Sequence, residues 1–103
     1  MADAAPSRRD LLRSEYLSQT ARIPWQDLQT HYARGSVIVV APELDLVEVA
    51  VTLGLDDTGA FQDWIASGAV AAVSETQARE WFAAQMCLWA VVAAPWVLVQ
   101  ARD

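Results

Sequence analysis

Apolar residues recur at helical spacing along much of the chain, and residues that begin or end helices bound each such stretch. Ser7 followed by Asp10 predicts a helix start, because a hydroxyl accepts from free N–H groups and a carboxylate favours the positive helix end. A second helix is predicted from Pro24, which suits the first helical position, to Gly35, which suits the residue after the last turn.

Three more helices are predicted further along the chain. One runs from Pro42 to Gly54 and is apolar around most of its circumference, which indicates burial. The next is capped by residues 56–58 and stops at Gly68. Residues 74–77, serine with glutamine three positions later, form a capping box that opens the last helix.

Four stretches have the composition of strands. Residues 36–40 are a β-branched run that is apolar on both faces, as in an interior strand. Residues 69–73, 88–93 and 96–99 are the others, and Pro95 must lie at a bulge, a bend or an edge because proline cannot donate to a ladder. The predicted fold is α+β, a small mixed sheet of three to four strands packed with about five helices. We expect residues 1–6 to be disordered and residues 7–103 to form one domain.

The composition indicates that part of the apolar surface is covered by another subunit. Hydrophobic residues make up 54% of the chain, and charged residues make up only 19% against a usual value of roughly 25%. A chain of 103 residues with so little polar surface has difficulty covering its own core. We therefore expect a homo-oligomer or a docked protein subunit partner.

The charges argue against nucleic acid and membranes as partners. The net charge is −6, and the chain contains no lysine. Beyond residue 34, nine acids face only Arg79 and Arg102. Phosphate neutralisation needs clustered cations, and an acidic field repels anionic surfaces and anionic substrates.

The single cysteine and the N-terminal residues predict a cytoplasmic protein. Cys87 lies in an apolar run without a second cysteine to pair with, which fits a reducing compartment. The first nine residues contain no apolar segment of a signal peptide. The longest apolar run, residues 86–99, is interrupted by Pro95 and is shorter than the roughly 17–25 residues of a membrane span.

No catalytic or metal-binding set is recognisable. Cys87 would need a basic partner, and His31, the only histidine, lies on a helix that nothing in the sequence brings near it. One histidine and one cysteine do not supply the usual ligands of zinc. The four glycines stand singly rather than in a phosphate-binding loop. We expect no cofactor, no metal and no enzymatic activity.

The carboxylates form the one dense polar group. Asp45, Glu48 and Asp56 fall on one helical stripe, with Asp57 close to its end. The simplest interpretation is a solvated face together with acids that favour helix starts. The same four residues are a candidate recognition surface for a basic partner. Two alternatives are a site for a small cationic ligand or divalent metal, and acid–base catalysis if a shared pocket raises the carboxylate pKa values.

Tryptophan is unusually frequent. The five are Trp25, Trp64, Trp81, Trp89 and Trp96. The first three fall on apolar helix faces, which predicts core positions. Trp89 and Trp96 have odd spacing, which places them on opposite faces of an unbroken strand and on the same face if a bulge at Pro95 shifts the alternation. Trp96 and Pro95 are the candidate interface, because tryptophan is enriched at binding hot spots. An aromatic cage for an organic cation is the alternative role.

Several segments together resemble a bacterial family, the domain of unknown function family 2288. They are Ile23-Pro24-Trp25-Gln26-Asp27-Leu28, Gly35 with the valines after it, Leu44-Asp45-Leu46-Val47-Glu48-Val49-Ala50, Asp56-Asp57, Trp64 with Gly68, and Leu88-Trp89-Ala90-Val91-Val92-Ala93-Ala94-Pro95-Trp96-Val97-Leu98-Val99-Gln100. The similarity covers about residues 15–100. It implies a single bacterial domain and brings no activity, cofactor or catalytic residue. The leading interpretation is a non-enzymatic protein-interaction or structural module of a bacterial cytoplasmic assembly.

Overall fold

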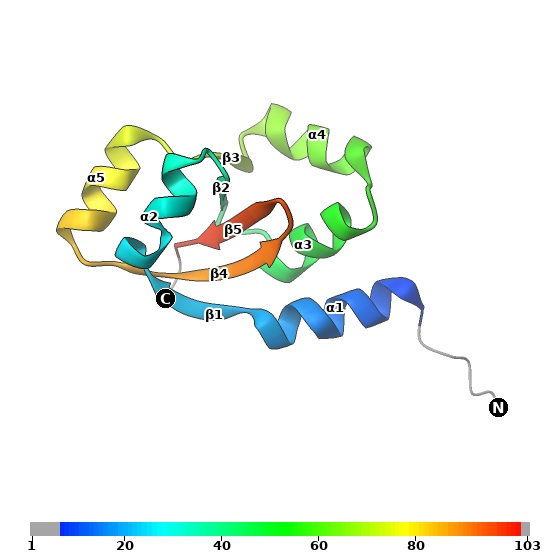
Figure 1. Ribbon diagram of the computed structural model, residues 1–103. Coiled ribbons are helices and arrows are strands. Elements are labelled where there is room, and N and C mark those ends of the chain that lie inside the picture. The colour runs from blue at the N-terminus through cyan, green and yellow to red at the C-terminus, as the bar shows by residue number, and fades with distance from the viewer. Residues whose placement is uncertain (1–6, 102–103) are drawn as a thin grey trace.

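Five helices and five strands make up residues 7–101, the part of the chain that the computed structural model describes (Figure 1). The helices are α1 (Arg8–Gln19), α2 (Trp25–Ala33), α3 (Leu46–Gly54), α4 (Thr58–Ser67) and α5 (Glu75–Ala83). The strands are β1 (Ala21–Pro24), β2 (Val37–Val40), β3 (Val70–Ala72), β4 (Cys87–Ala93) and β5 (Trp96–Gln100). The α+β class is confirmed.

The strands form one mixed sheet in the order β1-β4-β5-β2-β3. β4 and β5 are an antiparallel hairpin whose turn, Ala94–Pro95, contains a cis peptide bond. β5 then pairs in parallel with β2, with Leu98 opposite Ile38, and the remaining pairings are antiparallel. Pro95 lies in the bend between two strands, where its missing N–H interrupts no ladder.

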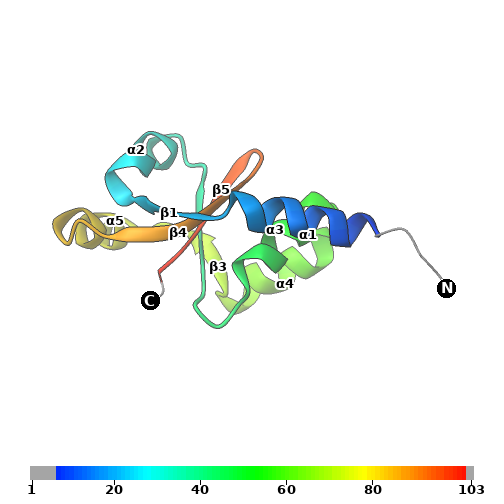
Figure 2. The same ribbon diagram turned by 90° about the horizontal axis from the view of Figure 1, so that it is seen from below.

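Helices cover both faces of this sheet, because its interior strands are apolar on both sides. α2 and α5 lie on one face, and α1, α3 and α4 lie on the other (Figure 2). The first core comprises Trp25, Leu28, Val37, Val73, Trp81, Leu88, Ala90, Val97 and Val99. The second comprises Ile38, Val40, Leu46, Val49, Ala50, Val70, Val91, Ala93 and Leu98. Alternate residues of β2 thus enter different cores, as a period of two requires.

The predicted helix ends are largely confirmed. Ser7 and Ser74 both form complete capping boxes at the starts of α1 and α5. Asp57 caps α4 by accepting from the backbone N–H of Ala60 at 3.2 Å. Gly68 ends α4 with a φ of 80°, a conformation that favours glycine.

Three local predictions were wrong. The sheet has five strands in the described residues rather than three to four, because residues 21–24 pair with β4 as an edge strand. Pro24 is therefore the last residue of β1 and the N-cap of α2, not its first helical residue. α3 begins at Leu46 rather than at Pro42, because the Asp45 side chain caps it there. The prediction for residues 1–6 lies outside the described residues.

None of the helices described here is both long enough and apolar enough to cross a membrane.

Candidate functional site

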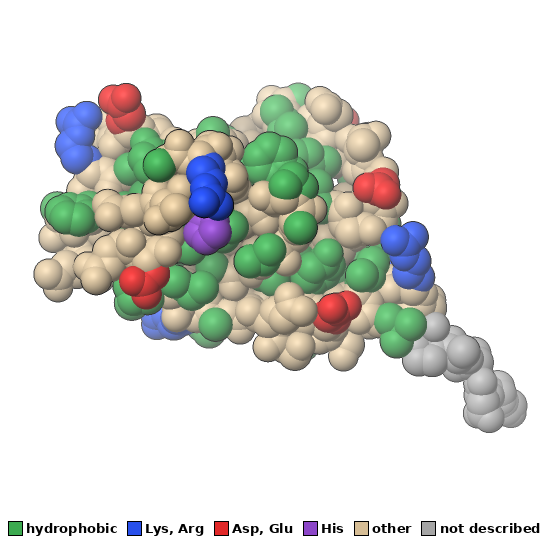
Figure 3. All heavy atoms as spheres, viewed as in Figure 1, with side chains coloured by type: hydrophobic (Ala, Val, Ile, Leu, Met, Phe, Trp, Pro, Cys, Tyr) green, Lys and Arg blue, Asp and Glu red, His purple; other side chains and the backbone are tan. Residues whose placement is uncertain are grey.

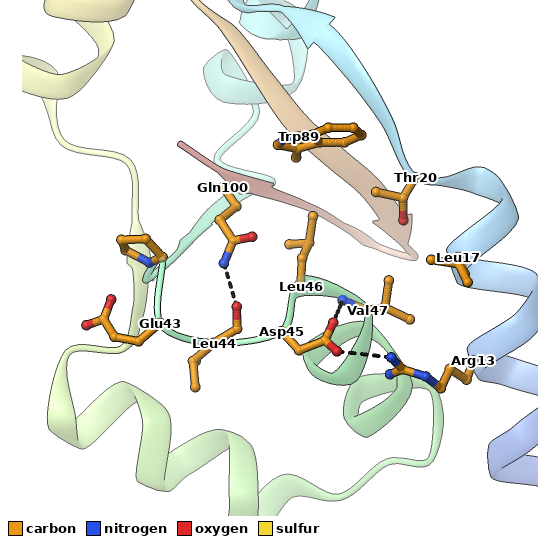
Figure 4. A pocket seen from close by; sticks show the side chains of 11 residues that line it. Arg13, Leu17, Thr20, Glu43, Leu44, Asp45, Leu46, Val47, Trp89 and Gln100 are labelled. Carbon is orange, nitrogen blue, oxygen red and sulfur yellow. Dashed lines mark hydrogen bonds and ion pairs between the residues drawn. The ribbon is translucent and has the colours of Figure 1, made fainter. Parts of the chain in front are cut away.

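A cavity of about 650 Å³ opens between the C-terminal half of α1, the segment before α3, and strands β4 and β5 (Figure 4). We call it the Trp89 cavity. Its lining residues are Arg13, Leu17, Thr20, Pro42, Glu43, Leu44, Asp45, Leu46, Val47, Trp89 and Gln100. The N-terminal helix α1 therefore forms one wall of the cavity, and the C-terminal hairpin β4–β5 forms its floor.

Gln100 anchors the floor of the Trp89 cavity. It is fully buried, and its Nε2 donates to the carbonyl of Ala41 at 2.8 Å and to that of Leu44 at 2.7 Å. These two bonds use both amide hydrogens, so they fix the carboxamide and hold the segment before α3 against the end of β5. The only signal in the sequence is that Gln100 is a polar residue at the end of an apolar strand, and this signal does not by itself indicate such a role.

Asp45 stands at the mouth of the cavity and makes two kinds of contact. Its side chain accepts from the backbone N–H of Val47 at 2.9 Å and of Glu48 at 3.4 Å, which caps α3. It also accepts from Arg13 Nη2 of α1 at 3.0 Å. Burial raises the pKa of Asp45, but the Arg13 bond, the two backbone bonds and the Arg13 charge together outweigh it, so its pKa is lowered.

Glu48 is paired with α1 as well. Arg13 Nη1 donates to Glu48 Oε2 at 2.5 Å, and Arg9 pairs with the other carboxylate oxygen. Arg9 and Arg13 lie four residues apart, so they share one face of α1. This face lies opposite Asp45, the N-cap of α3, and Glu48 in its first turn. This i,i+4 arginine spacing was the signal in the sequence that could have predicted the pairing.

The four candidate recognition acids therefore do not have equivalent surroundings. Asp45 and Glu48 are tied to arginines of α1, whereas Asp57 caps α4. Asp56 lies between α3 and α4 with a φ of 57° and is exposed. The expected solvated stripe is thus covered in part by the N-terminal helix. Their role in recognition remains a prediction.

Trp89 lies on β4 and borders the cavity. Its Nε1 is buried and, among the described residues, has no hydrogen-bond acceptor. The guanidinium carbon of Arg22, on the neighbouring strand β1, lies 5.7 Å from the centre of the Trp89 ring, within cation–π range. A buried donor without an acceptor is uncommon and calls for an explanation.

Trp89 and Trp96 lie on the same face of the sheet. The hairpin register places Trp96 opposite Ala93, and Ala93 shares its face with Trp89 by alternation along β4. Both tryptophans pack against the second core and are only partly buried, whereas Pro95 is exposed in the turn. Trp89 and Trp96 therefore share a face because the chain reverses in a hairpin turn between them, and not because of a bulge within one strand.

Cys87 and His31 are not brought together. Cys87 begins β4 and shares the face of Trp89, whereas His31 belongs to α2, which covers the opposite face. Within residues 7–101, no group of three or more histidine, cysteine, aspartate or glutamate side chains is arranged to hold a metal ion.

A second hollow lies between α2 and α5, and we call it the α2–α5 groove. Its volume is about 360 Å³, and its lining residues are Trp25, Gln29, Tyr32, Glu75, Ala78, Arg79 and Phe82. The Trp25 ring packs against the rings of Tyr32 and Trp81, with centroid distances of 5.4 and 5.2 Å. Phe82 is 58% exposed at its edge. Phe82 directly follows the core residue Trp81, and nothing in the sequence indicates that the Phe82 ring stays exposed.

Comparisons with known proteins identify a family and a solved structure that are similar to this chain. The model of the family described as "Protein of unknown function (DUF2288)" matches residues 11–101, so the chain belongs to this family. A solved structure, the NMR solution structure of PA1075 from Pseudomonas aeruginosa, is 37% identical in sequence. The match covers 99% of this chain and 94% of that one, with a TM-score of 0.79. No curated protein matches the chain.

Proposed function

Starting from a family of unknown function, we propose that this protein is a non-enzymatic interaction module that self-associates through the α2–α5 groove. The observation that carries this proposal is Phe82, a large aromatic that is 58% exposed on α5 beside the buried Trp25. Aromatic side chains at the edge of an apolar hollow are typical of interface anchors. Figure 3 shows apolar side chains at the surface over α5 and again over α4.

The proposed occupant of the groove is a second copy of the chain. Glu75 and Arg79 lie on the same stripe of α5 as Phe82, and their charged atoms are 3.8 Å apart. Their side chains are 86% and 79% exposed, so this pair contributes little within one chain. In a two-fold interface every contact occurs twice, and two antiparallel α5 helices bring each Glu75 toward the partner's Arg79.

The charge distribution fits a protein partner better than a nucleic acid. Acids outnumber arginines beyond residue 34, and Arg9 and Arg13 of the N-terminal region are paired with α3. The single cysteine fits a reducing compartment, so we place the module in the cytoplasm. Acid–base catalysis by Asp45 is disfavoured, because its pKa is lowered whereas a general acid needs a pKa near the working pH.

The experiment is sedimentation of the purified protein at ~100 μM, well above a micromolar dissociation constant. We expect a species larger than the 11.3 kDa monomer. Phe82→Glu should return it to a monomer, because the carboxylate would be buried in the interface. Ile65→Glu is the matched control, since Ile65 is 47% exposed on α4, away from the groove.

A charge exchange tests the two-fold arrangement itself. Glu75→Arg and Arg79→Glu chains should each be monomeric, because each would place like charges together in the interface. Mixing the two variants should restore a dimer, since every pair across the interface is then of opposite sign. A clean wild-type monomer at ~100 μM, or dimers in both single variants, would contradict the proposal.

A further inference from the structure

We propose that α1 is a strap that opens from α3 as one unit while the sheet stays folded, and that its arginines hold it closed through contacts that salt weakens. α1 lies alongside α3 and extends beyond the sheet (Figures 1 and 2). Both helices lie on the face of the sheet opposite to α2 and α5. The strap is therefore separate from the α2–α5 groove and does not depend on self-association.

The first argument is that α1 contributes little to the core. None of its residues is buried, whereas α2 buries Trp25 and Leu28. Leu12 and Tyr16 of α1 are half-buried and approach Gly54 of α3. A helix with few buried apolar contacts opens locally at a lower free-energy cost than the unfolding of the whole chain. Apolar packing alone therefore holds α1 less firmly than it holds α2.

The second argument is the set of polar contacts between α1 and α3. At the start of α3, Arg13 Nη2 donates to Asp45 at 3.0 Å, and Arg13 Nη1 donates to Glu48 at 2.5 Å. At its end, Arg8 Nη2 donates to the carbonyl oxygen of Gly54 at 3.3 Å. Gly54 is the last residue of α3, so these contacts reach from one end of that helix to the other. They close the strap along its whole length.

The third argument is that the ion pairs of the strap are open to water. Arg9 pairs with Glu48, and Arg13 pairs with both Glu48 and Asp45. The side chains in these pairs are 33–49% exposed. Salt screens exposed pairs, because the Debye length falls from about 30 Å at 0.01 M to about 3 Å at 1 M. Apolar packing has no charge to screen, so salt should act on α1 and not on α2.

The fourth argument is the distribution of charge between the strap and the rest of the chain. α1 holds three of the seven arginines, whereas the chain beyond residue 34 has nine acids and two arginines. The two acids of α1 contact residues of their own segment, Asp10 with Ser7 and Glu15 with Gln19. The side of α1 that meets α3 is therefore basic and faces an acidic body, an attraction that strengthens as the salt concentration falls.

Opening of the strap changes what the rest of the protein exposes. It leaves Asp45 and Glu48 without their arginines, and it removes Arg13 and Leu17 from the wall of the Trp89 cavity. The hinge is Thr20, the single residue between α1 and β1, which already has an extended backbone with a ψ of 129°. Ionic strength thus controls whether the acids at the start of α3 are paired or open to solvent.

The test is amide hydrogen exchange of the intact chain at ~0.01 M and ~1 M sodium chloride, followed residue by residue by NMR. The exchange rate of each amide is compared with that of a peptide of residues 7–20 in the same buffer, which corrects for the effect of salt on the exchange chemistry. We expect the protection of the second and third turns of α1 to fall about three- to tenfold at high salt, as the loss of several exposed ion pairs predicts. The protection of α2, β4 and β5 should change by less than about twofold.

Arg13→Gln should lower the protection of α1 at ~0.01 M salt and reduce its dependence on salt, because glutamine has the helix propensity of arginine without its charge. Arg79→Gln is the matched control, since it removes the same charge from α5 on the other face and should leave α1 unchanged. The proposal is overturned if neither salt nor Arg13→Gln changes the protection of α1. It is also overturned by a loss confined to the first turn, which is fraying, or by equal losses in α1 and α2, which is global unfolding.

Discussion

The guanidinium of Arg13 in α1 donates at 3.0 Å to the carboxylate of Asp45, the residue that caps α3. The Asp45 side chain thus caps the start of α3 and also binds α1 through Arg13. The contact joins residues 32 positions apart in the sequence. α1 itself contributes no fully buried residue, so polar contacts of this kind matter more for its placement than for that of the core helices.

Two substitutions at Asp45 separate its roles. Asp45→Ala removes both the cap and the pair with Arg13, and we expect it to cost about 1–2 kcal/mol. Asp45→Asn keeps a side chain that caps equally well, so it should cost only a few tenths of a kcal/mol, as expected for an exposed ion pair. Urea unfolding measures both losses. Equal losses would show that the charge, not the cap, is the larger contribution.

The stability should fall on acidification through the titration of Asp45. Its pKa in the folded chain is lowered, so its contribution is fully present above its unfolded-state pKa of about 3.9. The contribution is lost as the pH falls through the lowered folded pKa. Urea midpoints measured between pH 6 and pH 2.5, choices that bracket this range, should therefore decline more steeply for the wild type than for Asp45→Asn. Parallel curves would contradict the assignment.

Tyr16 of α1 approaches Gly54 of α3 closely. A β-carbon at position 54 would lie 2.9 Å from the Tyr16 hydroxyl oxygen, so one of the two helices or the tyrosine must shift. Gly54→Ala should therefore destabilise by about 1 kcal/mol, despite the higher helix propensity of alanine. Adding Tyr16→Phe removes the contacting oxygen and should recover part of the loss. Thermal unfolding of the single and double variants measures this coupling.

Replacing two further glycines by alanine should change the free energy of unfolding in opposite directions. Gly68 ends α4 at a φ of 80°, so Gly68→Ala should cost about 1 kcal/mol through backbone strain. Gly59 lies in the first turn of α4, where a β-carbon would meet only Asp57 Oδ1 at 3.8 Å. Gly59→Ala should stabilise by up to about 1 kcal/mol. A destabilised Gly59→Ala variant, measured in urea, would show that α4 is packed differently.

Trp89→Ala and Trp96→Ala should both destabilise the chain. Each ring packs partly buried against the same core, so each loss should be roughly 2–3 kcal/mol, below the value for a fully buried tryptophan. Circular dichroism during urea unfolding measures the two losses. Sedimentation of the same proteins tests the interface prediction for Trp96: a folded Trp96→Ala variant that no longer associates would place the contact at the β4–β5 turn instead of at Phe82.

Residues close together in the sequence were sufficient to predict most helix ends and the interior strands. Ser7, Ser74, Asp57 and Gly68 act on backbone groups within a few residues, so their effect is readable from spacing alone. The apolar run before Pro42 likewise predicted an interior strand, because burial on both faces leaves no polar alternation. The edge strand β1 was missed, since four residues ending in proline form a strand only when β4 supplies the partner.

The sequence by itself determined the fold class, the family and most of the helix caps, because these depend on residues close together in the chain. Only the tertiary structure decided which side chains remain exposed to solvent and which are covered by another element. It placed Arg9 and Arg13 against Glu48, which covers acids that the sequence shows as an open stripe. It also set Trp89 beside Gln100 through the hairpin register. Such contacts depend on chain reversal and on helix docking over tens of residues, and no local spacing encodes either of them.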